Sequence, residues 1–190
     1  MRIGIFGGSF DPVHLGHLIV AEAAADTLSL DEVRFVPTAR QPLKDAESQS
    51  PVEHRLAMLS AAIDGNPRFR IDAIEVERGG TSYTIDTLCT LRDTFPQDEL
   101  FFLIGADAAR TLASWREVER LPEFATIVSF TREGAQAPPH PVIARSIRVP
   151  AIGISGTDIR RSVAAGRSIR YVVPDSVRSY IATHRLYHEV

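Results

Sequence analysis

The sequence has one cysteine, Cys89, among its 190 residues. A single thiol excludes an internal disulfide and a metal site built from several cysteines, and it fits a reducing compartment. A large excess of either charge is also lacking, because the formal net charge is −3. Without a general cationic field we expect no nucleic-acid partner, and a phosphorylated ligand would have to meet a local cluster of positive groups.

Long apolar runs are lacking too. No segment approaches the roughly 18 to 20 apolar residues that span a bilayer, so no membrane partner is expected. The first residues are apolar, but glycines, Asp11 and Pro12 interrupt them, and the small-residue cleavage site of a secretory signal is missing. We therefore expect a cytoplasmic protein. The length and the apolar fraction of 44% suit one globular domain over residues 1–190.

Strand-like apolar runs alternate with helix-like periodic segments. Strands are predicted at residues 2–6, 32–36, 70–76, 100–105 and 126–130, and helices at residues 15–28, 52–63, 82–94, 157–165 and 175–184. Residues 37–51 and most of 131–150 are predicted to be loops, and Cys89 is expected on the core face of its helix. This order predicts an α/β fold, namely a doubly wound parallel sheet with helices on both faces and a small C-terminal helical portion. In such sheets, ligands bind beyond the carboxyl ends of the strands.

The turn after the first predicted strand has features of a phosphate site. Gly7 and Gly8 would let the backbone approach a phosphate closely, and Ser9 adds a hydroxyl donor before Phe10. The helix that follows presents free N–H groups and the positive end of its dipole to an anion. The G-x-x-x-x-G-K-[ST] and G-x-G-x-x-G motifs are both absent here. A glycine pair after a strand is often a plain turn, so these residues alone do not decide the function.

Two histidines lie at the start of the same predicted helix. His14 and His17 are three residues apart and therefore share one helix face, where their ring nitrogens could donate to one polyphosphate. Two alternatives remain at this point: the pair could lie on the surface without a function, or it could bind a metal ion together with Asp11.

A second candidate phosphate segment lies near the C-terminus, in the string Ile154-Ser155-Gly156-Thr157-Asp158-Ile159-Arg160. Its hydroxyls suit a helix N-terminus, and Arg160 follows one turn later. A plain N-cap would explain Ser155 or Thr157, but it would not explain the arginine.

The string at residues 7–17, Gly-Gly-Ser-Phe-Asp-Pro-Val-His-Leu-Gly-His, closely resembles the signature of the nucleotidyltransferase superfamily with the H-x-G-H motif. Residues 154–160 are similar to that superfamily's second phosphate motif, I-S-S-T-x-I-R, with Gly156 in place of the second serine. The resemblance implies a Rossmann-like fold and the transfer of a nucleoside monophosphate from a nucleoside triphosphate. It also implies that His14, His17, Ser155, Thr157 and Arg160 contact the phosphates.

The remaining blocks resemble bacterial nicotinate mononucleotide adenylyltransferases over essentially the whole chain. These blocks are residues 77–88, residues 103–107 followed by Trp115, and the tail from Arg167 to Tyr187. The resemblance implies that ATP and nicotinate mononucleotide are the substrates, that nicotinate adenine dinucleotide and pyrophosphate are the products, and that Mg²⁺ bridges ATP oxygens. The residues assigned to the adenosine or the acceptor on this basis are Thr81, Tyr83, Thr84, Gly105, Asp107, Trp115 and Arg132.

The physical basis of these acceptor assignments is more general. N–H groups at the start of the helix near Thr81 to Thr84 could receive a carboxylate, and Trp115 offers a flat face to a pyridine ring. Tyr83 and Trp115 could equally be core aromatics. The family's basic loop departs from its usual pattern in residues 40–44, where it has one proline and no histidine, and Lys44 is assigned to phosphate.

Several alternatives remain open at the level of sequence. Within the superfamily, phosphopantetheine adenylyltransferase shares both phosphate motifs but lacks the block at residues 80–84. An acceptor with an amide in place of the acid, or the use of both, would need few changes in the site. Outside catalysis, a nucleotide sensor or a metal-binding module with His14 and His17 would fit parts of the pattern. The sequence leaves a homo-oligomer open.

Overall fold

The computed structural model describes residues 1–40, 50–131, 138–150 and 152–188. Its six strands form one sheet in the order β3-β2-β1-β4-β5-β6, and every neighbouring pair is parallel. This is the strand order of a Rossmann-like doubly wound sheet, as the alternation of elements predicts. The strand order reverses between β1 and β4. From β1 the chain proceeds to β2 and β3 on one side, and from β4 it proceeds to β5 and β6 on the other.

The strands of the described residues are β1 (Arg2–Gly8), β2 (Glu32–Pro37), β3 (Phe69–Ile71), β4 (Glu99–Ile104), β5 (Thr126–Thr131) and β6 (Ile143–Arg148). The α-helices are α1 (Leu15–Thr27), α2 (Val52–Ile63), α3 (Ile74–Arg78), α4 (Thr84–Thr94), α5 (Ala106–Thr111), α6 (Gly156–Ala164) and α7 (Asp175–Thr183). Two 3₁₀ segments, η2 (Leu112–Ser114) and η3 (Val118–Glu123), follow α5.

Successive residues of the central strands enter two separate cores. In β4, Phe101 and Leu103 belong to the core that also contains side chains of α1, α2, α6 and α7, whereas Leu100, Phe102 and Ile104 belong to the core that contains side chains of α4 and α5. Because side chains alternate along a strand, a sheet covered on both faces needs apolar residues at every position. The continuous apolar run at residues 100–104 meets this need, which confirms the predicted arrangement of helices on both faces.

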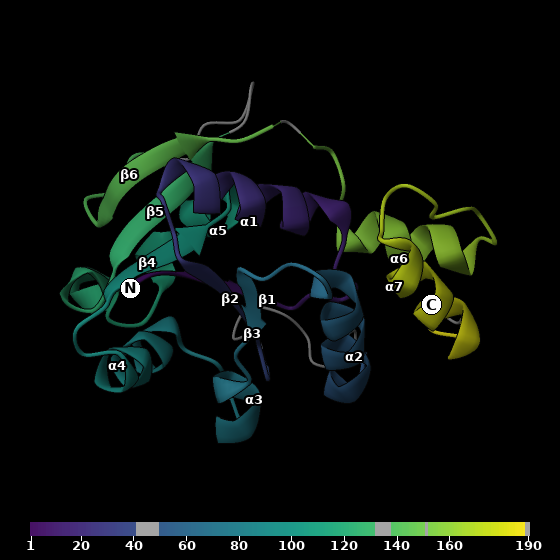
Figure 1. The fold of residues 1–190 in the computed structure, drawn as a ribbon, viewed down its shortest axis with the longest axis horizontal. Helices are drawn as coiled ribbons and strands as arrows, with labels where there is room; N and C mark the ends of the chain where they lie inside the picture. The colour runs from purple at the N-terminus through teal and green to yellow at the C-terminus, as the bar shows by residue number, and fades with distance from the viewer. Residues whose placement is uncertain (41–49, 132–137, 151, 189–190) are drawn as a thin grey trace.

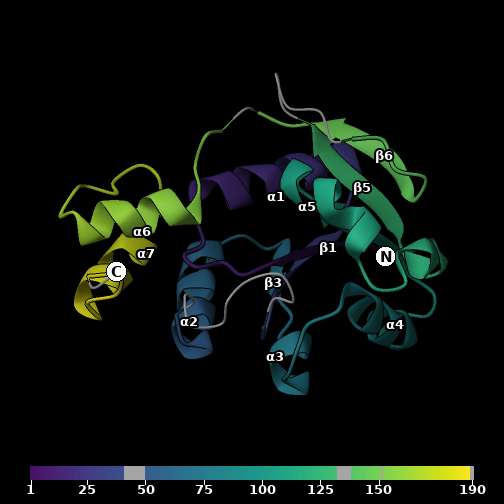
Figure 2. The ribbon, with the colours of Figure 1, turned by 180° about the vertical axis from the view of Figure 1, so that it is seen from behind.

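The last two helices form the predicted C-terminal portion. In both views of the molecule, α6 lies beside the N-terminal end of α1, and α7 lies beside α2 (Figures 1 and 2). A backbone hydrogen bond of 3.0 Å from the Leu15 N–H to the Val172 carbonyl joins this portion to the start of α1. The C-terminal portion therefore packs next to the H-x-G-H segment.

Two of the predicted elements were wrong. Residues 70–76 are not one strand, because the Asp72 side chain accepts the N–H of Ile74 at 3.2 Å and the chain turns into α3. The loop predicted over 131–150 contains β6, an edge strand whose side chains are mostly exposed and which therefore has no apolar pattern.

The prediction for Cys89 was also wrong, because Cys89 is exposed and does not face the core. In the described part of the chain, no helix is long and apolar enough to cross a membrane.

Candidate active site

A cavity of about 430 Å³ opens at the point where the strand order reverses. Its walls come from the carboxyl ends of β1, β2 and β4, from the start of α4, and from α5 with the segment that follows it. The predicted site residues in these walls are Gly7, Gly8, Tyr83, Thr84, Gly105, Asp107 and Trp115. Sequence reasoning thus found both the edge of the sheet and much of the wall.

One side of the cavity is the N-terminus of α4. Tyr83 is the N-cap residue and makes no side-chain cap, so the first N–H groups of the helix have no capping acceptor. Thr84 is the first helical residue and lines the cavity. Free N–H groups and the positive end of the helix dipole favour an anion here.

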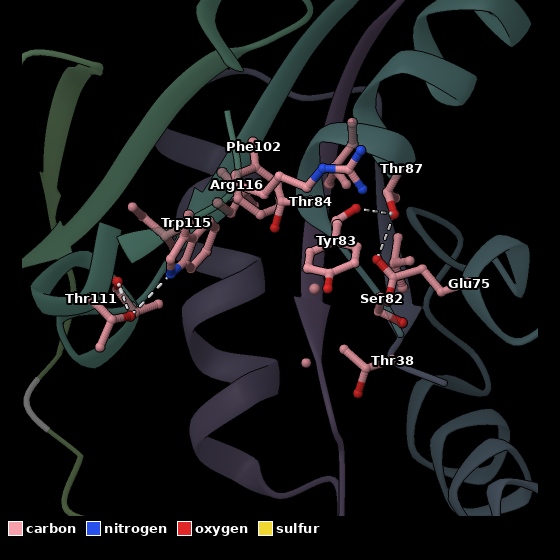
Figure 3. A pocket seen from close by; sticks show the side chains of 18 of the residues that line it. Thr38, Glu75, Ser82, Tyr83, Thr84, Thr87, Phe102, Thr111, Trp115 and Arg116 are labelled. Carbon is pink, nitrogen blue, oxygen red and sulfur yellow. Dashed lines mark hydrogen bonds between the residues drawn. The ribbon is translucent and has the colours of Figure 1, made fainter. Parts of the chain in front are cut away.

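Trp115 forms part of another wall (Figure 3). Its indole N–H donates to the Thr111 hydroxyl at 3.1 Å, and its ring meets Phe102 edge-on at 6.3 Å between centroids. The one polar group of the indole therefore has its hydrogen-bond partner within the protein. The face of the partly buried ring remains available for stacking with a flat ligand. Trp115 thus packs against the core and also borders the cavity.

The cavity also contains charged residues that the sequence reasoning missed. Glu75 from α3 is buried, and its Oε1 accepts the Thr87 hydroxyl at 2.7 Å (Figure 3). Burial raises the pKa of this carboxyl, and its Oε2 has no hydrogen-bond partner among the described residues. Arg116 lies with its guanidinium 5.1 Å from the centre of the Tyr83 ring. Glu75 lies two residues before the block at residues 77–88, so the resemblance did not include it.

Asp107 lies in the first turn of α5, next to Gly105, which is the N-cap residue. The Asp107 carboxylate is exposed and forms an ion pair with Arg110 one turn later. Asp107 therefore stabilises the start of a short helix and also borders the cavity.

The two histidines are stacked at the start of α1. Their ring centroids lie 3.7 Å apart with an angle of 21° between planes. His17 Nδ1 accepts the backbone N–H of His14 at 3.3 Å, so in the neutral ring the proton lies on Nε2, which can donate. A Cβ on Gly16 would lie 3.0 Å from His14 Nδ1, which explains why a glycine stands between the two histidines.

Both histidines are neutral at physiological pH in this structure. Burial lowers the pKa of His14 to about 4 and places that of His17 well below its usual value, to which the neighbouring His14 also contributes. His14 Nδ1 is buried and has no partner among the residues that the structure describes. The pair therefore offers neutral N–H donors.

Asp11 joins the two predicted phosphate segments. Its backbone carbonyl accepts a hydrogen bond from Arg160 Nη1 at 2.6 Å, and a Cβ on Gly156 would lie 2.9 Å from the same oxygen. The missing side chain at Gly156 thus allows the start of α6 to approach the H-x-G-H segment. Ser155 is the N-cap residue of α6, and its Oγ accepts the N–H of Asp158 at 3.1 Å.

The Asp11 carboxylate is fully engaged within the protein. Oδ1 accepts the Tyr187 hydroxyl at 2.6 Å, and Oδ2 accepts the Ser50 N–H at 3.1 Å. In the described ranges, no three His, Cys, Asp or Glu side chains lie close enough together to hold a metal ion. These contacts explain Asp11 as a structural residue of the site.

Arg55, which was not among the predicted site residues, supports the turn after β1. Its guanidinium is buried and donates to the carbonyls of Ser9 at 2.8 Å, Thr38 at 2.9 Å and Ser50 at 3.2 Å. The three acceptors belong to the turn after β1, the end of β2 and the segment before α2. One side chain therefore ties together the segments that surround the site. In the sequence it is one arginine within an amphipathic helix, and no signal there distinguishes it from a surface residue.

The remaining predicted residues fall into four groups. Phe10 is buried and meets His17 edge-on, with ring centroids 5.1 Å apart, and Ile154 packs against the same core. Thr81 forms a bridge with Arg40 and is not part of the cavity wall. Thr157 is exposed at the start of α6, where its Oγ1 lies 3.4 Å from Arg160 Nη2. Lys44 and Arg132 lie outside the described residues.

A family model described as cytidylyltransferase-like matches residues 5–162. A relative from Thermus thermophilus, named "Probable nicotinate-nucleotide adenylyltransferase", is 50% identical over 98% of this chain and 100% of its own length. A relative from Salinibacter ruber with the same name is 42% identical over 98% of each chain.

Solved structures give the same fold. The structure titled as Plasmodium falciparum nicotinic acid mononucleotide adenylyltransferase complexed with APC has a TM-score of 0.79 and is 19% identical, covering 98% of this chain and 97% of that one. The same enzyme complexed with NaAD has a TM-score of 0.77 and is 21% identical, with the same coverage. At these identities the match concerns the arrangement of strands and helices.

Proposed function

Because this chain belongs to the nicotinate-nucleotide adenylyltransferase family, within the cytidylyltransferase-like proteins, we propose that it transfers AMP from ATP to nicotinate mononucleotide. The products are nicotinate adenine dinucleotide and pyrophosphate. The observation that carries the proposal is the 50% identity to a full-length relative, together with a cavity at the strand-order reversal whose wall includes Gly7 and Gly8.

The reaction needs little acid–base chemistry from the protein. The acceptor phosphate is already an anion at neutral pH, so its oxygen attacks the α-phosphorus of ATP without a protein base. The P–O bond to the β-phosphate breaks, and pyrophosphate leaves with the electron pair. Catalysis then rests on alignment of the two substrates and on donors for the phosphate charge.

The donors suited to the triphosphate gather where α1 and α6 begin. We assign His17 Nε2–H, His14 and the free N–H groups at Gly156 and Thr157 to this role, with Arg160 reaching the leaving phosphates. Lys44 and Arg132 are proposed as further phosphate contacts on the basis of the family resemblance. Two helix N-termini directed at one anion supply positive potential without any titrating group.

The acceptor's pyridine end suits the α4 side of the cavity. In this proposal the ring stacks on Trp115, and its carboxylate receives N–H groups at the start of α4, near Tyr83 and Thr84. Gly105 and Asp107, on the β4–α5 side, are assigned to the adenosine ribose or the acceptor. Thr81 would act indirectly, through the loop that it joins to Arg40.

The donor set suits Mg²⁺ bound through the substrate. The carboxylate of Asp11 is engaged by Tyr187 and Ser50, so the segment offers donors to phosphates and no open carboxylate to an ion. No carboxylate of this segment would hold Mg²⁺ directly, so the ion would be held mainly through the ATP phosphates and would neutralise part of their charge. We place the reaction in the cytoplasm and in one domain, and the oligomeric state is a matter for solution measurement.

Identification of the product tests this function. The purified protein is incubated with ATP, Mg²⁺ and nicotinate mononucleotide, and the products are separated and weighed by mass spectrometry. The expected result is nicotinate adenine dinucleotide in a one-to-one ratio with pyrophosphate, and loss of both with an Arg160→Gln variant. ATP binding without either product, for any pyridine mononucleotide, would contradict the proposal and favour a nucleotide sensor.

A further inference from the structure

The cavity wall includes three charged side chains among the described residues, and they differ in how much of their charge is available. Glu75 is buried against the Thr87 hydroxyl, and Asp107 is paired with Arg110. Arg116 is the one cationic side chain in the wall as described. For a ligand with an anionic end, Arg116 is therefore the one positively charged side chain in the described wall of the cavity.

Arg116 is held loosely in this structure. Its guanidinium lies 3.7 Å from Asp86 Oδ2 and 3.5 Å from Glu117 Oε1, and both separations exceed those of well-formed hydrogen bonds. Its side chain is 53% exposed and rests over the Tyr83 ring. A small rotation would exchange these weak surface pairs for a closer partner in the cavity, since such exposed pairs contribute little.

The place of this cation matters because Tyr83 is the N-cap residue of α4. In Figure 3, Arg116 extends over the region between Trp115 and Thr87, beside Tyr83 and Thr84. The guanidinium thus borders the same end of the cavity as the free N–H groups of the helix. A carboxylate at this end would meet the helix dipole and a full positive charge together.

The N–H groups alone discriminate weakly between the two pyridine acceptors. The oxygen of a carboxamide can accept from a backbone N–H, as a carboxylate oxygen can. The two ligands differ by one negative charge. When the Glu75 carboxyl in the cavity wall is ionised, it disfavours a second anion nearby. A cation that interacts with the carboxylate but not with a neutral amide is what separates them.

We propose that the Arg116 side chain is a specificity-determining residue that selects an acceptor with a carboxylate on its pyridine ring over one with a carboxamide. The inference rests on the proposed adenylyl transfer and adds a residue for the choice of acceptor. The acceptor phosphate is common to the acid and the amide, so a residue that contacts the phosphate changes both alike. Only a residue at the ring substituent changes their ratio.

The test compares Arg116→Gln with the unchanged protein, using nicotinate and nicotinamide mononucleotides at saturating ATP. We expect kcat/KM for the acid to fall about tenfold, mostly through KM, as for loss of one charge-assisted contact. We expect kcat/KM for the amide to change less than twofold. Arg116→Lys, which keeps the charge, should retain more of the acid preference than the glutamine variant.

Arg120→Gln is the matched control. Arg120 has a similar exposure of 51%, lies over the Phe124 ring at 5.7 Å and pairs with Glu117, but it is not in the cavity wall. Its substitution should leave the acid-to-amide ratio unchanged. Equal losses for both acceptors with Arg116→Gln, or no change in either, would overturn the inference. Absence of turnover in the unchanged protein would instead contradict the proposed function.

Discussion

Arg160 and the backbone of Asp11 are joined by a hydrogen bond of 2.6 Å across 149 residues of sequence. This contact draws the start of α6 against the turn that precedes α1. In the proposed function, the N-termini of both helices donate to the triphosphate.

The close approach at Asp11 depends on Gly156. A Gly156→Ala variant would place a Cβ 2.9 Å from the Asp11 carbonyl oxygen, so the start of α6 must move away. We expect kcat/KM for ATP to fall about tenfold, since small displacements of positioning groups are costly. Gly153→Ala is the matched control, because a Cβ there meets nothing within 4 Å. Equal kinetics for the two variants would contradict the prediction.

His17 is expected to be a donor in the transition state. Its Nδ1 accepts a backbone N–H, so its Nε2–H is directed elsewhere. His17→Ala should lower kcat by about a hundredfold or more, as for loss of one transition-state donor. Steady-state release of pyrophosphate gives the measurement, with His188→Ala, an exposed residue, as the control. Near-normal turnover would remove His17 from the phosphate site.

Stability should depend on pH through His14. Its pKa is about 4 in the folded protein, below the ordinary value of 6.5, because the ring is buried. As pH falls from 6.5 toward 4, the unfolded chain binds the proton before the folded one, so stability is lost over this range. The loss should reach about 2 kcal/mol by pH 5 for His14 alone.

Urea unfolding at pH 7.5 and pH 5 measures this effect. Between these pH values, His14→Gln should lose less stability than the unchanged protein. The control His188→Gln should lose as much stability as the unchanged protein. An identical pH dependence for His14→Gln and the unchanged protein would show that burial of His14 does not disfavour its charge.

Arg55 should matter for stability and for ATP binding together. Arg55→Met removes the donor to three carbonyls, including that of Ser9 in the turn after β1. We expect a loss of about 3 kcal/mol in the free energy of unfolding, as for buried acceptors left without partners. The remaining folded protein should have a raised KM for ATP. Arg178→Gln, an ion-paired residue on α7, should change stability by less than about 0.5 kcal/mol.

The sequence predicted the sheet well where its signals are local. The apolar run of β4 and the periodic pattern of α2 each have one physical explanation, and both were confirmed. β6 was missed because an edge strand packs few side chains and its hydrogen bonds to β5 leave no pattern in the sequence. α3 was mistaken for a strand because five residues are too few to establish a helical period.

The helix starts of the candidate site were predictable where residues form a contiguous motif. Gly7 to His17 and Ser155 to Arg160 each lead into a helix, as the local pattern predicts, and their role as phosphate contacts stays a prediction. Arg55, Glu75 and Arg116 come from separate elements and meet the site only through the fold. Their roles depend on distances between segments that sequence spacing does not contain.

The most direct test of the central claim is a pyrophosphate-release assay with ATP and either nicotinate or nicotinamide mononucleotide, run side by side. We expect the unchanged protein to release pyrophosphate with both acceptors, with kcat/KM clearly higher for the acid. Equal values for the acid and the amide would contradict the choice of acceptor. No release with either acceptor would contradict adenylyl transfer itself.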